Sequence, residues 1–344
     1  MKNFTCQHCK NVVYFENHTC EACRQWLGYE PISSQMLSTG LQQTVPRFQL
    51  NGRNYKYCSN HQYHVCNWLI DANSADTLCE ACNLNRTIPN LSVKENVLEW
   101  KNLERAKSRL IYALKQWNLP FVRGVNGSYD LLFDFLSGDE KLKKDQSAMT
   151  GHANGLITIN LAEADAIHRE QVKQELEEPY RTLIGHFRHE VGHYYWDRLI
   201  NENQYNLNAF RQLFGDDRAD YGKALEQHYK KEHNYNWKGN YISKYASSHP
   251  WEDWAETWAH YLHLVDMVDT ALNVGLLNKN YTQISDAYHH HNFSDIYKAI
   301  VPLSIAVNSL NRSMGQPDIY PFVIPKPVQQ KLEFVHSILR NYNS

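Results

Sequence analysis

The sequence predicts an α+β protein, mainly helical, in which small cysteine-rich modules precede a larger helical domain. Two observations carry this prediction. All eight cysteines of the 344-residue chain lie at or before Cys82. After them, apolar residues recur at steps of three and four, which is typical of amphipathic helices, with a few short β-branched runs in between. We therefore expect a cysteine-rich region over residues 1–90 and a helical domain with a C-terminal helical extension over residues 91–344.

Composition and charge limit the setting in which the protein works. The formal net charge is −2, and 42% of the residues are hydrophobic. A near-neutral chain exerts no global attraction on nucleic acid or on an anionic membrane. No apolar run approaches the roughly 20 residues of a membrane span. The first residues, MKNFTCQHCK, lack the apolar core of a signal peptide. We therefore expect a cytoplasmic protein that neither crosses a membrane nor binds nucleic acid.

The first four cysteines follow the pattern C-x2-C-x10-C-x2-C. They are Cys6, Cys9, Cys20 and Cys23. In a reducing compartment this pattern indicates a metal site rather than disulfides. Each C-x2-C turn directs two thiolates at one ion, and two turns complete the tetrahedral shell of four sulfurs that zinc accepts. The sequence therefore predicts a first structural zinc.

The second four cysteines are spaced less regularly. They are Cys58, Cys66, Cys79 and Cys82. We expect these four thiolates to hold a second structural zinc. His61, which stands in C-x2-H relation to Cys58, is the alternative ligand to Cys66. The long interval between Cys23 and Cys58 favours two sequential zinc sites, and a cross-braced pairing of the cysteines is the alternative.

The role of this region follows from its charge and its size. Its basic residues are few and unclustered, whereas nucleic-acid binding requires a basic, aromatic-bearing face. Each zinc would hold together a segment too short to build a core of its own. We therefore expect a structural role, with the docking of a protein partner as the alternative.

The middle of the chain alternates helices with short strands. Residues 91–120 carry apolar side chains at helical spacing and end at a proline. Residues 128–138 and 155–162 are rich in β-branched or aromatic residues bounded by glycine, which predicts strands. Residues 163–178 predict a polar-faced helix. Pro179 opens the next helix, because the missing N–H of a proline costs little in a first turn.

The helix after Pro179 contains the pattern H-E-V-G-H. His189 and His193 are four residues apart, so both imidazoles project from one face of the helix. Glu190 lies beside that face. Two neutral imidazoles that hold Zn2+, with an adjacent carboxylate that accepts a proton from water, are the parts of a zinc peptidase. Gly192 would let another segment approach this helix closely.

A catalytic zinc needs a third protein ligand and an open fourth position. One common zinc-peptidase pattern has a histidine where this chain has Leu199, so that pattern fails. A second helix, over residues 247–268, carries Glu252 and Glu256 on one face. We expect Glu252 to bind the metal and Glu256 to accept a hydrogen bond from a zinc-binding histidine. The reverse assignment is the alternative.

These two helices resemble the gluzincin metallopeptidases. HEVGH followed by Y-x6-E-x3-E is similar to the catalytic domain of anthrax lethal factor and its relatives. The resemblance implies that His189, His193 and Glu252 hold the zinc. It also implies that Tyr245 faces the reacting carbonyl and hydrogen-bonds the oxyanion.

A second resemblance covers almost the whole chain. The segments EPYRTLIGHFRHEVGHYYWDRL, FGDDRADYGKALEQHY and HPWEDWAETWAHYLH, with the cysteine-rich front, are similar to bacterial zinc-binding metallopeptidases that carry an N-terminal zinc ribbon. This resemblance implies a zincin-like metallopeptidase fold for the helical domain, preceded by zinc-ribbon modules.

The function that we expect is hydrolysis of a peptide or protein substrate, with one catalytic and two structural zinc ions and Glu190 as the general base. The segment TGHANGLITINLA precedes the active helix, and an exposed strand edge there could align the substrate backbone. One alternative is a non-enzymatic, partner-binding zinc-ribbon protein with a structural HExxH site. Another is an enzyme whose ribbons gate the active site.

Overall fold

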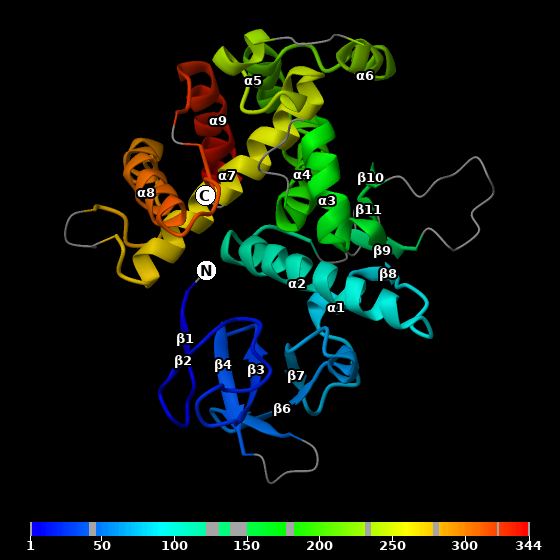
Figure 1. Ribbon diagram of the computed structural model, residues 1–344, viewed down its shortest axis with the longest axis vertical. Coiled ribbons are helices and arrows are strands. Elements are labelled where there is room, and N and C mark those ends of the chain that lie inside the picture. The colour runs from blue at the N-terminus through cyan, green and yellow to red at the C-terminus, as the bar shows by residue number, and fades with distance from the viewer. Residues whose placement is uncertain are drawn as a thin grey trace.

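The fold is α+β, as the sequence predicts, with predominant helices and small sheets. The computed structural model describes residues 2–40, 46–121, 131–137, 150–176, 182–230, 235–277, 282–321 and 323–342. Figure 1 shows the cysteine-rich region at one end of the molecule and most of the helices at the other. Helix α2 (Lys94–Gln116) lies between these two parts and corresponds to the helix predicted over residues 91–120.

Short antiparallel strands build the cysteine-rich region. They are β1 (Phe4–Thr5), β2 (Val12–Val13), β3 (Trp26–Glu30), β4 (Gln35–Thr39), β5 (Phe48–Leu50), β6 (Arg53–Tyr57) and β7 (Leu69–Asp71), accompanied by the short helices η1 (Ser59–Tyr63) and α1 (Glu80–Asn83). β1 pairs with β2, β3 pairs with β4, and β5, β6 and β7 form one sheet. Lys10 and Arg24 each follow a C-x2-C turn with a left-handed φ of 63°. Each donates its N–H to the carbonyl of the first cysteine of its turn, so the two turns have the same form.

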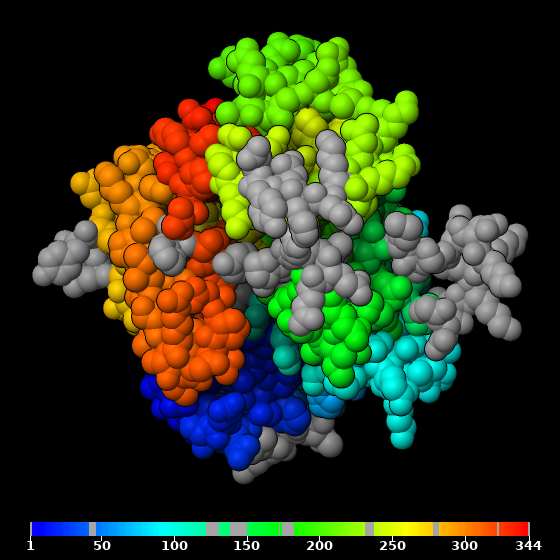
Figure 2. All heavy atoms as spheres, turned by 45° about the horizontal axis from the view of Figure 1, so that its top comes forward, coloured from blue at the N-terminus to red at the C-terminus, as the bar shows by residue number. Residues whose placement is uncertain are grey.

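Helix α2 is buried mainly in its second half. Its buried residues include the consecutive runs 106–108 and 110–114. One face packs against the cysteine-rich region, where the rings of Phe15 and Tyr112 have centroids 5.3 Å apart. The space-filling view shows the cysteine-rich region (blue) directly against the helical part of the molecule (Figure 2). A helix segment that is buried on all sides belongs to the core, so α2 joins the two parts rather than linking them loosely.

A four-stranded sheet adjoins α2. Its order is β10 (Gly151–Ala153), β11 (Leu156–Asn160), β9 (Leu132–Leu136) and β8 (Asn85–Thr87). β11, β9 and β8 run parallel, whereas β10 pairs antiparallel with β11 and forms an edge. Asn154 and Gly155 join β10 to β11 with φ values of 49° and 83°, which suits a tight Asn-Gly hairpin turn. The strand predicted over residues 128–138 is β9, and its first predicted residues lie outside the described part of the chain. The sequence did not indicate β8, which adds the end of the cysteine-rich region to this sheet.

The other helices follow in chain order. They are α3 (Ala166–Leu176), α4 (Leu183–Tyr195), α5 (Gln204–Phe214), α6 (Tyr221–Lys230), α7 (Pro250–Asn273), α8 (Phe293–Ser313) and α9 (Lys326–Tyr342), with the short turns η2 (Leu161–Ala164), η3 (Trp196–Asn201), η4 (Tyr235–Gly239) and η5 (Tyr245–Ser247). Thr182 caps α4, because its hydroxyl oxygen accepts the N–H of Gly185 at 3.0 Å. Pro179, which was expected to open this helix, lies outside the described residues. In the described part of the chain, no helix combines the length and the apolar character that crossing a membrane requires.

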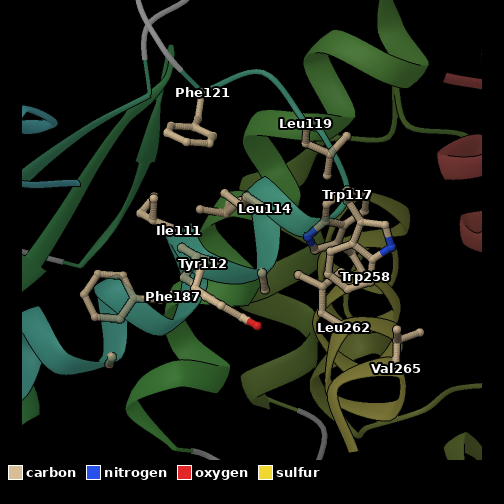
Figure 3. Close-up of a cluster of buried hydrophobic side chains, with 14 of the residues drawn as sticks. Ile111, Tyr112, Leu114, Trp117, Leu119, Phe121, Phe187, Trp258, Leu262 and Val265 are labelled. Atoms are coloured by element: carbon tan, nitrogen blue, oxygen red, sulfur yellow. The ribbon is translucent and has the colours of Figure 1, made fainter. Parts of the chain in front are cut away.

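Helices α2, α4 and α7 meet in a common hydrophobic core (Figure 3). Its labelled residues are Ile111, Tyr112, Leu114 and Trp117 from α2, Leu119 and Phe121 after it, Phe187 from α4, and Trp258, Leu262 and Val265 from α7. The expected close approach at Gly192 is confirmed. A Cβ atom there would lie 3.0 Å from the Cα of Ala255 on α7. This contact sets the HEVGH helix directly beside α7.

Candidate functional site

Helices α4 and α7 bring three side chains to one point. The Nε2 atoms of His189 and His193 lie 3.2 Å apart. Oε2 of Glu252 lies 3.0 Å from Nε2 of His189 and 3.4 Å from Nε2 of His193. All three residues are at most 8% exposed. The i, i+4 spacing on α4 supplies the two imidazoles, and the first turn of α7 supplies the carboxylate.

The geometry of this triangle fits a zinc ion. Nitrogen and oxygen ligands that lie about 2.0–2.1 Å from a tetrahedral zinc are about 3.3 Å from one another. The three observed distances between ligand atoms, 3.0, 3.2 and 3.4 Å, lie on both sides of that value. Oε2 of Glu252 is buried and has no hydrogen-bond donor in the described part of the chain, so a bound cation would satisfy it. Among the described residues, this group contains only two imidazoles and one carboxylate, which would leave the fourth position of a tetrahedral zinc open, as in catalytic zinc sites.

The start of α7 holds Glu252 in place. Nδ1 of His249 accepts the N–H of Trp251 at 3.1 Å and so caps the helix. Nε2 of the same ring donates to the carbonyl of Ala219 at 3.0 Å. Pro250 occupies the first helical position, where its missing N–H costs nothing. The cap therefore fixes the turn that carries the carboxylate.

Glu256 lies one turn further along α7, behind His189. Its Oε1 lies 2.7 Å from Nδ1 of His189. A carboxylate oxygen only accepts, so Nδ1 carries the proton and Nε2 of the same ring is free to bind a metal. Burial raises the pKa of Glu256, but the hydrogen bond from His189, together with the charges of His189 and His260, lowers it to about 2. The ring of His193 packs instead against Trp251, with centroids 3.7 Å apart.

Glu190 lies beside the three ligand candidates without joining them. Its Oε1 is 3.3 Å from Nε2 of His186, one helical turn earlier. Nδ1 of His186 lies 3.3 Å from Oε2 of Glu163, so the imidazole sits between two carboxylates. Burial raises the pKa of Glu190, but His186 and the neighbouring imidazoles lower it below its ordinary value. Glu190 is therefore an ionised carboxylate at neutral pH.

Two tyrosines flank the site, and one of them was missed. Tyr245, in η5, has its ring centroid 5.8 Å from that of His189. Burial and then the Glu252 carboxylate raise the pKa of Tyr245, which keeps its hydroxyl protonated. The hydroxyl of Tyr221, the first residue of α6, donates to Oε1 of Glu252 at 2.6 Å. The sequence analysis used this segment, FGDDRADY, only for a family resemblance, and no short-range pattern indicated a role for Tyr221. In the structure its neighbour Asp217 pairs with Arg211.

The cysteines form two separate groups. One contains Cys6, Cys9, Cys20 and Cys23, the other Cys58, Cys66, Cys79 and Cys82, and within each group the sulfur atoms lie within 4.8 Å of one another. The pairs Cys6–Cys23 and Cys9–Cys20 are 3.6 Å apart, and Cys66–Cys79 is 3.7 Å apart. Four sulfurs about 2.3 Å from one zinc would be about 3.8 Å apart, far beyond the roughly 2.05 Å of a disulfide. This grouping corresponds to sequential rather than cross-braced sites.

His61 stands apart from the second group. Its Nδ1 lies 3.0 Å from the carbonyl oxygen of Cys66, to which it donates, and its ring stacks on Tyr57 with centroids 3.5 Å apart. Cys66 instead accepts the backbone N–H of Trp68 at its sulfur, 3.4 Å away. The geometry thus places Cys66, and not His61, among the four side chains of this group that could bind a metal.

Comparison with known proteins agrees with this chemistry. A family model described as "Putative zinc-binding metallo-peptidase" matches residues 96–338, and a zinc-ribbon domain model matches residues 3–93. The chain belongs to this zinc-binding metallopeptidase family and carries an N-terminal zinc ribbon. Zinc is supported both by the family and by the two four-cysteine clusters.

The curated relatives extend along the whole chain. Uncharacterized proteins of Mycobacterium bovis and of two strains of Mycobacterium tuberculosis are each 39% identical over 340 residues. The similarity covers 98% of this chain and 95% of each relative. No solved structure matched the chain.

Proposed function

We propose that the protein is a zinc-dependent peptidase of the gluzincin type. The convergence of His189, His193 and Glu252 within 3.0–3.4 Å, with Glu190 beside them, is the observation that carries the proposal. A purely structural metal site would need a fourth protein ligand and would have no use for Glu190. A zinc ion held here would polarise a carbonyl and lower the pKa of water.

Three other side chains carry the remaining roles in the proposed reaction. Glu190 accepts a proton from the attacking water and returns it to the leaving amine. Tyr245 donates a hydrogen bond to the oxygen on which negative charge develops. Glu256 holds His189 in the tautomer that leaves Nε2 unprotonated. The position and the protonation state of each side chain suit the role proposed for it.

The edge of the sheet supports a peptide as the substrate. β10 is an edge strand, and an extended peptide can pair with such an edge through its backbone. His152 on β10 has its ring centroid 6.2 Å from that of His193. A chain added along β10 would therefore pass close to the three ligand candidates.

We further propose two structural zinc ions in the cysteine groups, and hence three zinc ions per chain. The division into residues 1–90 and 91–344 is part of the same proposal, supported by the two family matches that meet between residues 93 and 96. Thiolates used as metal donors suit a reducing compartment such as the cytoplasm.

The test combines metal analysis with cleavage profiling. We expect three zinc ions per wild-type chain and new peptide termini when the protein acts on a denatured proteome. Glu190→Gln should retain three zinc ions and lose at least about 10²-fold in cleavage, because it removes the proton acceptor. Glu202→Gln, an exposed glutamate beyond the end of α4, is the matched control and should cleave like wild type. Cleavage by Glu190→Gln at the wild-type rate would refute the mechanism, and absence of cleavage by wild type would refute the peptidase proposal.

A further inference from the structure

Tyr221 contacts Glu252 from a different helix. It is the first residue of α6, and its hydroxyl donates to Oε1 of Glu252 at 2.6 Å. Its ring packs edge-on against His249 and Trp251, with centroids 5.3 and 5.7 Å away. These two residues form the cap and first turn of α7. The turn of α7 that carries Glu252 therefore also holds the ring of Tyr221 in place.

The two oxygens of Glu252 have different surroundings. Oε1 accepts from Tyr221, whereas Oε2 lies against the two imidazole nitrogens. The last torsion of a glutamate side chain is broad, so the chain alone does not fix which oxygen faces the histidines. A strong hydrogen bond from a hydroxyl to a carboxylate does fix it. This contact distinguishes two oxygens that are otherwise equivalent.

We propose that Tyr221 is a positioning residue for the catalytic metal: it holds Oε1 of Glu252 so that Oε2 is presented toward His189 and His193. The proposal rests on the assignment of Glu252 as a ligand in the proposed function. It adds a residue that acts on the metal through Glu252, from a helix outside the two that carry the ligands. Groups that orient metal ligands typically change metal affinity by 10–100-fold when they are removed.

Tyr221→Phe isolates the hydroxyl with little risk to the fold. Tyr221 is 39% exposed and begins its helix, so loss of one oxygen there leaves no buried cavity. Tyr205→Phe is the matched control, since Tyr205 lies in the first turn of α5 and is 81% exposed. Zinc content is measured after equilibration with increasing concentrations of a chelator. The two zinc ions of the cysteine groups report that the variant is folded.

The expected result is that Tyr221→Phe releases one zinc per chain at a 10–100-fold lower chelator activity than wild type, and that Tyr205→Phe behaves like wild type. A second readout uses cobalt in place of that one zinc. The visible absorption of cobalt depends on the number and arrangement of its ligands, so a carboxylate freed from Tyr221 should change the spectrum. Neither measurement depends on cleavage of a substrate.

Three outcomes would count against the proposal. Equal zinc retention and an unchanged cobalt spectrum in Tyr221→Phe would overturn it. Loss of all three zinc ions together would show that Tyr221 supports the fold rather than the ligand. If the wild-type chain holds only two zinc ions, the catalytic metal site is absent and both proposals fail. If wild type holds three zinc ions but Glu190→Gln cleaves normally, the proposed catalytic mechanism fails while the Tyr221 result stands.

Discussion

Replacement of Gly192 by alanine tests whether the close contact of α4 and α7 sets the metal geometry. Gly192 is the glycine of HEVGH. A Cβ atom at this position would lie 3.0 Å from Cα of Ala255, 3.3 Å from its carbonyl oxygen and 3.2 Å from Cδ1 of Trp258. Carbon atoms pack best at about 3.5–4.0 Å. Two of the three obstructing atoms belong to the backbone of α7, so rotation of a side chain cannot relieve the contact.

The magnitude follows from two opposing effects. Alanine is favoured over glycine in a helix by about 1 kcal/mol. An extra methyl group in a tightly packed core costs about 1–3 kcal/mol. We therefore expect a net loss in the free energy of unfolding of only about 0–2 kcal/mol. The helices must separate by about 0.5 Å to relieve the contact, whereas metal sites accept deviations of about 0.2 Å. His189 and His193 would move away from Glu252 by more than the site accepts.

The assay measures zinc retention and thermal unfolding of Gly192→Ala in parallel. We expect the variant to lose one zinc per chain at a chelator activity at least 10-fold lower than wild type, with a small change in melting temperature. Gly222→Ala is the matched control, because an added Cβ in α6 would meet only Oδ1 of Asp220 at 3.7 Å. If Gly192→Ala retains its third zinc as tightly as wild type, the close contact does not set the metal geometry.

Two further predictions concern the C-terminal helix α9. Nζ of Lys331 lies 2.6 Å from Oδ2 of Asp253 and both side chains are buried, so Lys331→Met should lower the free energy of unfolding by about 3–5 kcal/mol. Urea unfolding tests this, and a loss no smaller in the double variant Lys331→Met/Asp253→Asn would contradict the pairing. Burial lowers the pKa of His336 to about 4, below its ordinary value of 6.5, and Nδ1 of its neutral ring accepts from Tyr261. Stability from this group is therefore present above pH 6.5 and is lost toward pH 4, by about 1.4 kcal/mol per pH unit. His336→Gln should be less stable than wild type at pH 7 and less sensitive to acid, and an unchanged slope of stability against pH would refute the assignment.

Short-range spacing accounts for much of what the sequence predicted. His189 and His193 share a helix face because they are four residues apart, and the structure has that helix. The two C-x2-C turns at Cys6 and Cys20 adopt the same backbone form because a local hydrogen bond closes each of them. The α+β class, the zinc ribbon and the family were likewise correct. The identities of the metal ligands stay predictions, although the geometry suits them.

What the sequence did not indicate depends on contacts between distant segments. β8 is a three-residue strand whose pairing with β9 is set by the sheet and not by any alternation of its own. Tyr221 reaches Glu252 only because α6 packs against the first turn of α7. A single tyrosine at the start of a polar helix carries no pattern that one chain can reveal. Such contacts require the three-dimensional arrangement itself.

The packing of α2 bears on what the zinc ribbons do. Ion pairs join Arg109 to Glu16 and Lys115 to Glu80. Helix α2 therefore contacts both the segment with the first four cysteines and the segment with the second four. On the side of the sheet, Phe133 of β9 contacts Phe187 of α4, with ring centroids 5.7 Å apart. Phe187 lies two residues before His189 on the helix that carries both imidazoles. The ribbons therefore support α2, α2 and the sheet support α4, and α4 carries the histidines. A region that continues the core in this way supports the helix that carries the two candidate imidazole ligands. A partner would have to bind its outer surface, where side chains such as Tyr14 and Ile32 are exposed.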